Sequence, residues 1–235
     1  SLYQSRILGE FPQQSEDALI SMKDVDDARE KENEEEVDAY KIVSSDIATS
    51  QGDNKTVILV RTGHSIDEID IYGKLLVTSP TETSAVSLIK QKYEKIEGDT
   101  IIVDSDGVGE GVVNSLSGYR LPIIEFHGGY GHKAIESLKF RNLRSQFYWI
   151  VSKKFEKGLY SLKKLPPKIF DLLKSQLCSI KTKKPDALGR LQIETKDDMR
   201  ARSMPSPDLA DAFMMAEYAF WTAKFSDLNP YKYLG

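Results

Sequence analysis

The order of extended and helical segments is the feature of this sequence that most constrains its fold. Three β-rich runs come first, separated by turn-forming residues, at Tyr40–Ala48, Lys55–Arg61 and Ile66–Tyr72. Beyond residue 82 the pattern changes, and segments with a helical spacing of apolar residues alternate with short apolar runs. We therefore predict an α/β fold in which three antiparallel strands are continued by parallel strands, as a mixed sheet flanked by helices.

The alternating part of the chain is predicted to contain two further strands, a hairpin and five helices. The strands are expected at Thr100–Asp104 and Leu121–Phe126, and the hairpin joins Ser179–Lys183 to Arg190–Glu194. The helices are expected at Glu82–Ile96, Gly107–Leu116, Ala134–Lys153, Pro166–Leu177 and from Ser206 to about Thr222. The last helix has a typical start, because Ser is a good N-cap, Pro fits the first turn and Asp interacts favourably with the helix N-terminus.

Size and composition are those of a globular protein. The chain has 235 residues, of which 40% are hydrophobic and 29% are charged, enough for a substantial core. No apolar run approaches the roughly 18 residues of a membrane span, and the single cysteine, Cys178, excludes an internal disulfide and a multi-cysteine metal site. Residues 1–38 have little apolar pattern, so we expect a linker or arm there and one domain over residues 39–235.

Charge is unevenly distributed along the chain. The net charge is −4, yet residues 133–202 contain 18 Lys or Arg against 7 Asp or Glu. A basic segment within an acidic protein indicates a surface that faces a polyanion such as a nucleic acid. A solvated, lysine-rich helix face is the simpler interpretation and stays open.

Acidic residues stand on predicted elements that a mixed sheet would bring together. Asp46 lies on the first strand, Asp104 ends the fourth, and Asp208 and Asp211 lie one turn apart on the last helix. If the first and fourth strands are neighbours, a helix packed on the sheet completes a cluster of carboxylates. Such a cluster is tolerated when hard cations such as Mg²⁺ or Mn²⁺ neutralise it. Two such ions about 4 Å apart promote in-line displacement at phosphorus, which predicts a phosphodiester substrate.

Three of these four acidic residues also have a purely structural interpretation, whereas Asp211, on the flank of an apolar helix stripe, needs a partner. Asp46 and Asp104 could stabilise turns, and Asp208 could simply interact with the helix dipole. Other candidate motifs are weaker, because the glycines near residue 109 do not complete a dinucleotide-binding loop and no phosphate-binding loop occurs. The histidines lack metal-ligand spacing, so we expect structural roles for His64, His127, His132 and Cys178, with His127 and His132 near the rim of a site.

Five stretches, spread over nearly the whole sequence, carry a resemblance to one protein family. They are Tyr3–Pro12, Asp46–Ala48 with Gly52-Asp53, Ile102–Gly109, Phe140–Asn142 with Tyr148-Trp149, and Ser206–Ala212. In these stretches the chain resembles the C-terminal nuclease domain of the large terminase subunit of tailed bacteriophages. That domain has a ribonuclease H-like fold related to Holliday-junction resolvases, and Tyr3–Pro12 looks like the linker that follows its motor domain.

The resemblance implies a metal-dependent endonuclease that cuts concatemeric double-stranded DNA during viral genome packaging. It implies that Asp46, Asp104 and Asp211 are catalytic and that, together with Asp208, they bind two Mg²⁺ or Mn²⁺ ions; Asp53 and Asp106 match the family less securely. The implied partners are double-stranded DNA, an ATPase domain of the same polypeptide outside these residues, the portal and the small terminase subunit, with no membrane. The implied location is the cytoplasm of the infected bacterium, transiently at the procapsid portal.

The basic segment supplies candidate DNA contacts, because lysines bind duplex phosphates largely independently of sequence. We predict DNA contacts at Lys153, Lys154, Lys157, Lys163, Lys164, Lys181, Lys183 and Lys184. Two other functions stay open: a non-catalytic DNA-gripping or docking module of the packaging motor, and a junction-resolving nuclease of the same fold. Metal-dependent cleavage by the purified domain would exclude the first, and a preference for linear over four-way DNA would exclude the second.

Overall fold

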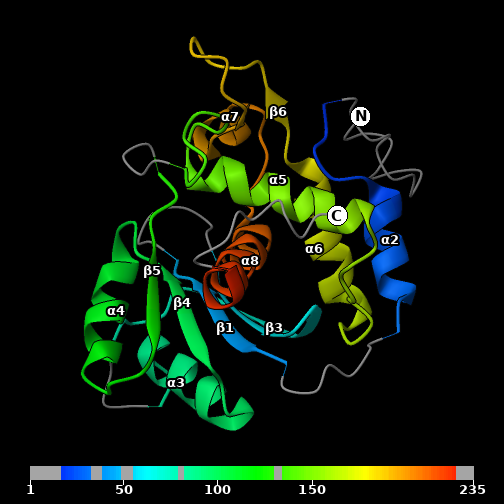
Figure 1. Ribbon diagram of the computed structural model, residues 1–235. Coiled ribbons are helices and arrows are strands. Elements are labelled where there is room, and N and C mark those ends of the chain that lie inside the picture. The colour runs from blue at the N-terminus through cyan, green and yellow to red at the C-terminus, as the bar shows by residue number, and fades with distance from the viewer. Residues whose placement is uncertain (1–16, 33–38, 49–54, 79–81, 130–133, 226–235) are drawn as a thin grey trace.

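The computed structural model describes residues 17–32, 39–48, 55–78, 82–129 and 134–225, and in these residues five strands form one mixed sheet (Figure 1). The strand order is β3-β2-β1-β4-β5. The bounds are β1 Lys41–Asp46, β2 Thr56–Thr62, β3 Ser65–Tyr72, β4 Thr100–Asp104 and β5 Ile123–Phe126. Strands β1, β2 and β3 pair antiparallel, whereas β4 pairs parallel with β1 and with β5. The predicted mixed sheet, antiparallel and then parallel, is confirmed.

Helices cover both faces of this sheet, with α3 and α4 on one face and α8 on the other (Figure 1). Their bounds are α2 Met22–Glu30, α3 Ala85–Ile96, α4 Val108–Ser117, α5 Leu143–Glu156, α6 Pro167–Ser179, α7 Lys196–Ala201 and α8 Asp208–Phe225. Two short strands, β6 Thr182–Lys183 and β7 Gln192–Ile193, form the predicted hairpin. None of the helices in the described part of the chain is long and apolar enough to traverse a lipid bilayer.

Successive strand residues alternate between two hydrophobic clusters, one on each face of the sheet. Ile42 and Ile102 belong to the cluster under α8, whereas their neighbours Val43 and Val103 belong to the cluster under α3 and α4. This is the two-residue period of a strand that is buried on both faces. The same period assigns the even-numbered positions at the ends of β1 and β4 to the α8 face.

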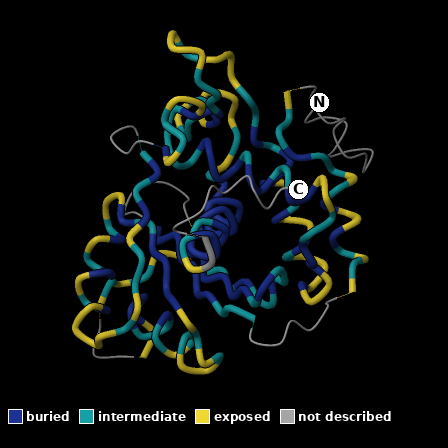
Figure 2. Tube along the Cα trace, in the orientation of Figure 1, coloured by how far each residue is buried: buried dark blue, intermediate teal, exposed yellow. Residues whose placement is uncertain are grey.

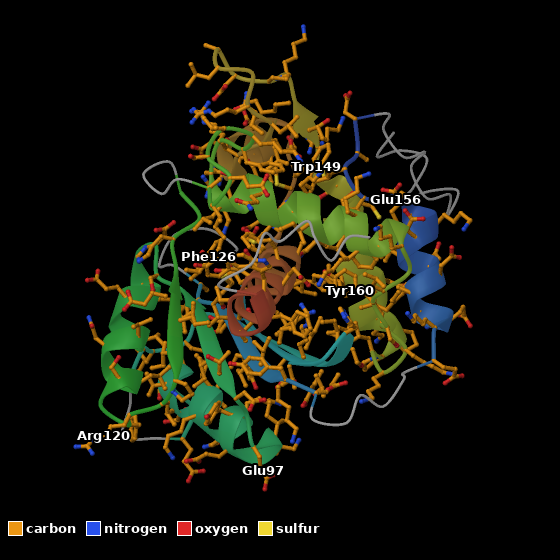
Figure 3. All side chains as sticks on the ribbon, viewed as in Figure 1. Glu97, Arg120, Phe126, Trp149, Glu156 and Tyr160 are labelled. Carbon is orange, nitrogen blue, oxygen red and sulfur yellow. The ribbon has the colours of Figure 1, made fainter. Side chains whose placement is uncertain are left out.

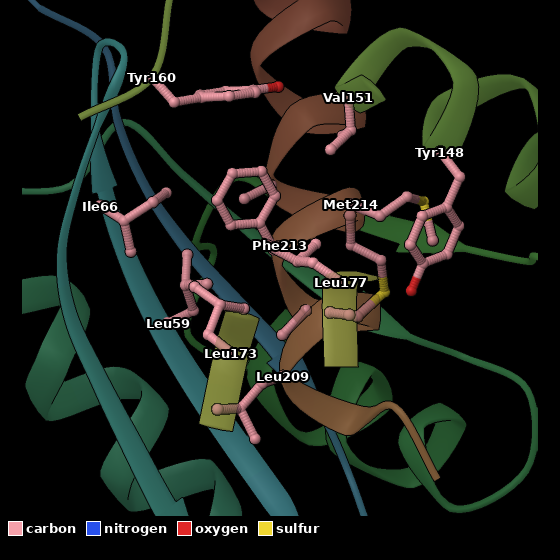
Figure 4. Packing of buried hydrophobic residues seen from close by; sticks show 14 of the residues in the cluster. Leu59, Ile66, Tyr148, Val151, Tyr160, Leu173, Leu177, Leu209, Phe213 and Met214 are labelled. Carbon is pink, nitrogen blue, oxygen red and sulfur yellow. The ribbon is translucent and has the colours of Figure 1, made fainter. Parts of the chain in front are cut away.

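Helix α8 crosses the sheet as a buried element rather than as an amphipathic surface helix. Its small residues Ala210, Ala212 and Ala216 are fully buried and let the helix lie close to the strands. The Ser44 hydroxyl on β1 donates a hydrogen bond of 2.7 Å to the Ala212 carbonyl oxygen. Figure 2 shows α8 as a mostly buried rod, and Figure 4 shows Phe213 packed beside Tyr160 in the core.

An ionised carboxylate lies inside this core, on α8. Glu217 is 1% exposed, and its Oε2 accepts hydrogen bonds of 2.7 Å from Arg61 Nη1 on β2 and from the Tyr160 hydroxyl. Its Oε1 lies 2.5 Å from Lys154 Nζ on α5. Burial acts to raise the pKa of Glu217, but the positive charges of Lys154 and Arg61 outweigh this effect and lower the pKa to about 2. The carboxylate therefore stays charged and joins β2, α5 and α8.

The predicted helix over Ala134–Lys153 begins later than expected, at Leu143. Asn142 is its N-cap, because the Asn142 side chain accepts a hydrogen bond of 2.8 Å from the Ser145 amide. Just before this N-cap, the backbone is hydrogen-bonded to the hairpin segment rather than within a helix. Arg141 N donates to Leu191 O, and Leu191 N donates to Lys139 O. The prediction was wrong at this end because the backbone groups of this segment are used in a long-range pairing.

Part of the expected arm belongs to the same core. Helix α2 packs against α5 and α6, and its Val25 and Ala28 are fully buried. Leu19 N also donates a hydrogen bond of 2.9 Å to Ile180 O. Residues 1–16 and 33–38, including the linker-like stretch Tyr3–Pro12, lie outside the described residues, so the boundary at residue 38 stays a prediction.

We predict that Glu217→Gln destabilises the protein by about 3 to 5 kcal/mol at pH 7, because Arg61 and Lys154 would be left buried without a counter-charge. Urea denaturation would measure this loss. The exposed substitution Glu110→Gln on α4 is the control and should change the free energy of unfolding little. Because the pKa of Glu217 falls from its usual 4.5 to about 2, its contribution should be complete above pH 5 and disappear as the pH falls towards 2.

Candidate active site

Two of the predicted aspartates lie side by side at the ends of neighbouring parallel strands. Asp46 is the last residue of β1 and Asp104 is the last residue of β4. The register pairs Ser45 with Val103, so the next positions along the strands are the two aspartates. Both share the strand parity of Ile42 and Ile102, which places them on the α8 face.

The other two predicted aspartates lie in the first turn of α8, above the ends of these strands. Asp208 and Asp211 are 4% and 3% exposed. Asp208 Oδ2 accepts a hydrogen bond of 2.8 Å from the Lys55 amide, so one oxygen of this carboxylate already has a partner. The structure thus brings together the four acidic residues that the sequence singled out.

Burial and mutual repulsion act on the strand-end aspartates. Burial raises the pKa of Asp46 well above its usual value; Lys196 opposes this, and the charges of Asp104, Asp211 and Asp208 add to it. Burial likewise raises the pKa of Asp104, to about 6, against the opposing effect of Lys196. The folded protein therefore places these two carboxylates where their negative charges are poorly compensated.

A lysine from α7 supplies part of the missing positive charge. Lys196 Nζ lies 3.0 Å from Asp211 Oδ2 and 3.4 Å from Asp46 Oδ2. Burial lowers the pKa of Lys196, but Asp211 and Asp46 outweigh that effect and raise it. Lys196 is therefore an ammonium ion between two of the predicted metal ligands.

Asp211 is held differently from the other carboxylates. Its Oδ1 accepts hydrogen bonds from the Tyr148 hydroxyl at 2.8 Å and from Arg144 Nε at 3.1 Å, both on α5. Burial acts to raise the pKa of Asp211, but the positive charges of Arg144 and Lys196 outweigh this effect and lower the pKa to about 2. Asp211 is therefore ionised well below neutral pH, whereas the pKa values of Asp46 and Asp104 are raised.

A cavity of about 330 Å³ opens beside these groups. Its polar wall includes Asp104, Asp211, Arg144, Lys196 and Arg200, and its apolar wall includes Phe126, Ile193, Met214 and Met215. Asp106 and Gly129 form part of the rim, where Gly129 N donates a hydrogen bond of 3.2 Å to Asp106 Oδ2. Figure 3 labels Phe126 at the end of β5, which marks this side of the molecule.

The residues present fit a divalent cation in their chemistry. Their donors are carboxylate oxygens, which Mg²⁺ and Mn²⁺ prefer, and Asp211 Oδ2 is buried without a well-aligned hydrogen bond. In the described part of the chain, no group of three or more His, Cys, Asp or Glu side chains has the spacing of a formed metal site. The positive charge at this place comes from Lys196 instead.

The arrangement of elements matches solved nuclease domains from viral large terminase subunits. The nuclease domain of the large terminase subunit gp2 of bacterial virus Sf6 is 20% identical, with a TM-score of 0.71 over 85% of this chain and 98% of that chain. The large terminase nuclease from thermophilic phage G20c with bound cobalt is 12% identical, with a TM-score of 0.59 over 87% and 98%. The chain has the terminase-nuclease fold. No protein-family model and no curated protein sequence matches it.

On the terminase-nuclease fold, the eight predicted DNA-contacting lysines fall into two separate groups. Lys181, Lys183 and Lys184 lie on the β6–β7 hairpin, and Lys183 pairs at 2.7 Å with Asp198 of α7, the helix that carries Lys196. The other group lies in the last turn of α5 or follows the helix in the sequence, and comprises Lys153, Lys154, Lys157, Lys163 and Lys164. Figure 3 labels Glu156 and Tyr160 of this part of the chain. Along the helix axis, Lys153 is about 13 Å from Arg144.

One of these lysine predictions was wrong. Lys154 is 7% exposed and lies against Glu217 in the core, because it is on the inner face of α5. Lys163 and Lys164 are exposed but pair with Glu32 and Asp67. A lysine-rich sequence segment does not by itself reveal which of its lysines point inward.

Of the residues for which structural roles were predicted, His64 and Cys178 pack against core residues. His64 packs against the Phe220 ring, and burial raises the pKa of the Cys178 thiol to about 12. His127 lies at the rim, with Nδ1 3.3 Å from Asp106 Oδ1. His132 and Asp53 lie outside the described residues.

Sequence reasoning missed four polar residues of the site: Arg144, Tyr148, Lys196 and Arg200. Arg144 and Tyr148 are four residues apart on α5 and therefore share a helix face. This spacing was present in the sequence, because both residues also lie within the helix that was predicted. The short helix α7, which carries Lys196 and Arg200, has a capping box formed by Thr195 and Asp198. That pair was readable in the sequence as a helix start.

We predict that Asp104→Asn stabilises the metal-free protein at pH 7. The pKa of Asp104 is raised from 3.8 to about 6, so stability should fall as the pH rises from about 4 to 6. Asparagine cannot ionise, so it avoids this loss of unfolding free energy, which is at most about 3 kcal/mol. It also keeps an Oδ1 acceptor for the Asp106 amide.

Thermal unfolding in EDTA at pH 3.5 and at pH 7 measures this difference, with the exposed substitution Asp171→Asn as control. The variant should gain stability over the wild-type protein only at the higher pH. Equal stability of Asp104→Asn and wild type at pH 7 would contradict the raised pKa.

Proposed function

We propose that this chain is the nuclease domain of a viral genome-packaging terminase, a metal-dependent endonuclease that hydrolyses phosphodiesters of concatemeric double-stranded DNA. The observation that carries the proposal is the convergence of Asp46, Asp104 and Asp211. These three residues come from β1, β4 and α8 and meet beside one cavity with too little positive charge to balance them. The terminase-nuclease fold supports the same function.

In this proposal two Mg²⁺ or Mn²⁺ ions are held by Asp46, Asp104 and Asp211, with help from Asp208. Asp46 lies centrally, since the charges of the other three aspartates all act on it. Asp208 has one oxygen left to contribute, because its Oδ2 is taken by the Lys55 amide. Solved structures of the same fold support a divalent cation: a point mutant of the Sf6 domain was solved with manganese, and the G20c nuclease with magnesium. When bound, such ions polarise the phosphodiester and lower the pKa of a water molecule.

The positively charged side chains around the site orient or neutralise its carboxylates and attract the substrate. Arg144 and Tyr148 hold Asp211 in one orientation. Lys196 balances Asp46 and Asp211, and the exposed Arg200 at the cavity wall faces the space in which a phosphate would lie. These positive charges favour an anionic substrate over a neutral one.

We place the DNA duplex on the hairpin side of the molecule. Lys183 pairs with Asp198 of α7, and Asp198 also accepts a hydrogen bond from the amide of Thr195, the N-cap residue next to Lys196. Lys163 and Lys164, in contrast, follow the opposite end of α5. Lys181, Lys183 and Lys184 would then contact phosphates next to the cut. An ATPase domain of the same polypeptide, the portal and the small terminase subunit would be the further partners, in the cytoplasm of the infected bacterium and at the procapsid portal.

We expect the purified chain to nick and linearise supercoiled plasmid in Mn²⁺ or Mg²⁺ and not in EDTA. Asp104→Asn and Asp211→Asn should each lower the cleavage rate by at least about 100-fold, because each removes a carboxylate that holds the ions. Agarose-gel time courses with plasmid measure the rates.

The control for cleavage is Asp171→Asn, an exposed acid on α6, which should cut at the wild-type rate. If the plasmid stays intact with every metal while the protein still binds DNA, the nuclease function is rejected in favour of the non-catalytic DNA-gripping module. A strong preference for four-way junctions over plasmid would favour the junction-resolving nuclease.

The lysine groups can be separated by their effect on DNA affinity. Lys184→Ala should weaken binding of a linear duplex and reduce the slope of log K against log salt by about one, because one phosphate contact is lost. Contrary to the DNA contact predicted for Lys163 from the sequence, Lys163→Ala should leave the affinity and the slope unchanged, because Lys163 pairs with Glu32 away from the hairpin. Fluorescence anisotropy in EDTA at several salt concentrations measures them, and equal losses in the two variants would contradict the placement of the duplex.

A further inference from the structure

The two oxygens of the Asp211 carboxylate are in unlike surroundings. Oδ1 accepts two hydrogen bonds, from the Tyr148 hydroxyl at 2.8 Å and from Arg144 Nε at 3.1 Å. Oδ2 has no well-aligned hydrogen bond and has the Lys196 ammonium 3.0 Å away. A carboxylate saturated on one oxygen only cannot rotate about its Cβ–Cγ bond without losing both of those hydrogen bonds.

The two donors to Oδ1 are themselves fixed. Arg144 Nη1 donates a hydrogen bond of 2.8 Å to the Glu194 carbonyl oxygen, and the guanidinium lies over the Tyr148 ring, 4.9 Å from its centroid. Tyr148 is fully buried, and Figure 4 shows its ring in the core beside Met214 of α8. Both donors come from one face of α5, so the orientation of Asp211 depends on a helix that carries none of the proposed ligands.

We propose that Tyr148 is a positioning residue for the metal-binding carboxylate. With Arg144 it saturates Oδ1 and thereby leaves Oδ2 of Asp211 facing Lys196 and Asp46, where a divalent cation would bind. This inference rests on the proposed function, because it concerns the affinity of the same site for Mg²⁺ or Mn²⁺. Groups that orient a metal ligand in this way typically change metal affinity by about 10- to 100-fold.

The chain offers a matched control for this tyrosine. Tyr160 is also fully buried in the core cluster, and its hydroxyl also donates a hydrogen bond, of 2.7 Å, to a buried carboxylate on α8, that of Glu217. Tyr148→Phe and Tyr160→Phe therefore remove the same atom from the same kind of contact. They differ in which carboxylate loses its donor.

Isothermal titration of the whole chain with MnCl₂ tests the inference, with thermal unfolding as the measure of folding. We expect Tyr148→Phe to weaken Mn²⁺ binding by about 10- to 100-fold while Tyr160→Phe binds as the wild type does. Arg144→Lys keeps the positive charge but cannot bridge Asp211 and Glu194 as the planar guanidinium does, so it should also weaken Mn²⁺ binding.

Two results would overturn this role of Tyr148: wild-type Mn²⁺ affinity in both Tyr148→Phe and Arg144→Lys, or an equal loss of affinity in Tyr148→Phe and Tyr160→Phe. A wild-type protein whose Mn²⁺ titration is indistinguishable from that of Asp211→Asn would instead reject the metal site, and with it the proposed function. The wild-type and Asp211→Asn titrations therefore separate a failure of the proposed function from a failure of the inference.

Discussion

The buried carboxylate of Glu217 is the interaction on which the geometry of the site depends. It lies between Arg61 of β2 and Lys154 of α5, and these two ion pairs, which do not require the Tyr160 hydroxyl, fix α8 against both the sheet and α5. Asp211 lies on the same helix as Glu217, and its two hydrogen-bond donors lie on the same helix as Lys154. Helices are stiff over such lengths, so an ionic contact in the core sets distances at the cavity. Breaking such a contact costs far more than forming it contributes.

The four aspartates of the site are chemically identical but have been given different properties by their neighbours. Asp211, beside Arg144 and Lys196, has its pKa lowered to about 2, whereas burial and like charges raise the pKa of Asp104 to about 6. The positive charges also differ in kind, because Arg144 is held by Glu194 and Tyr148 whereas Lys196 belongs to the short helix α7. The site therefore combines a helix carboxylate that is ionised well below neutral pH with strand-end carboxylates that lack sufficient counter-charge.

The sequence predicted those parts of the molecule that local patterns determine. The order of strands and helices gave the mixed sheet, and the positions of Asp46, Asp104 and Asp211 at element ends were enough to expect them together. It could not show that Lys154 points into the core, or that residues 139–141 pair with the hairpin, because both depend on contacts with distant residues. The roles of Arg144, Tyr148 and Lys196 were hidden for the same reason, since each acts through a carboxylate on another element.

The residues of the site come from widely separated parts of the chain, with Asp46 on the first strand and Asp211 on the last helix. During synthesis α8 leaves the ribosome after the other elements of the described residues, and its N-terminal turn can meet β1 and β4 only when the sheet already exists. A nascent or partly folded chain thus lacks one side of the carboxylate cluster. If the domain is the nuclease proposed here, its order of assembly delays cutting activity until folding is complete, which protects nearby DNA from an unfinished enzyme.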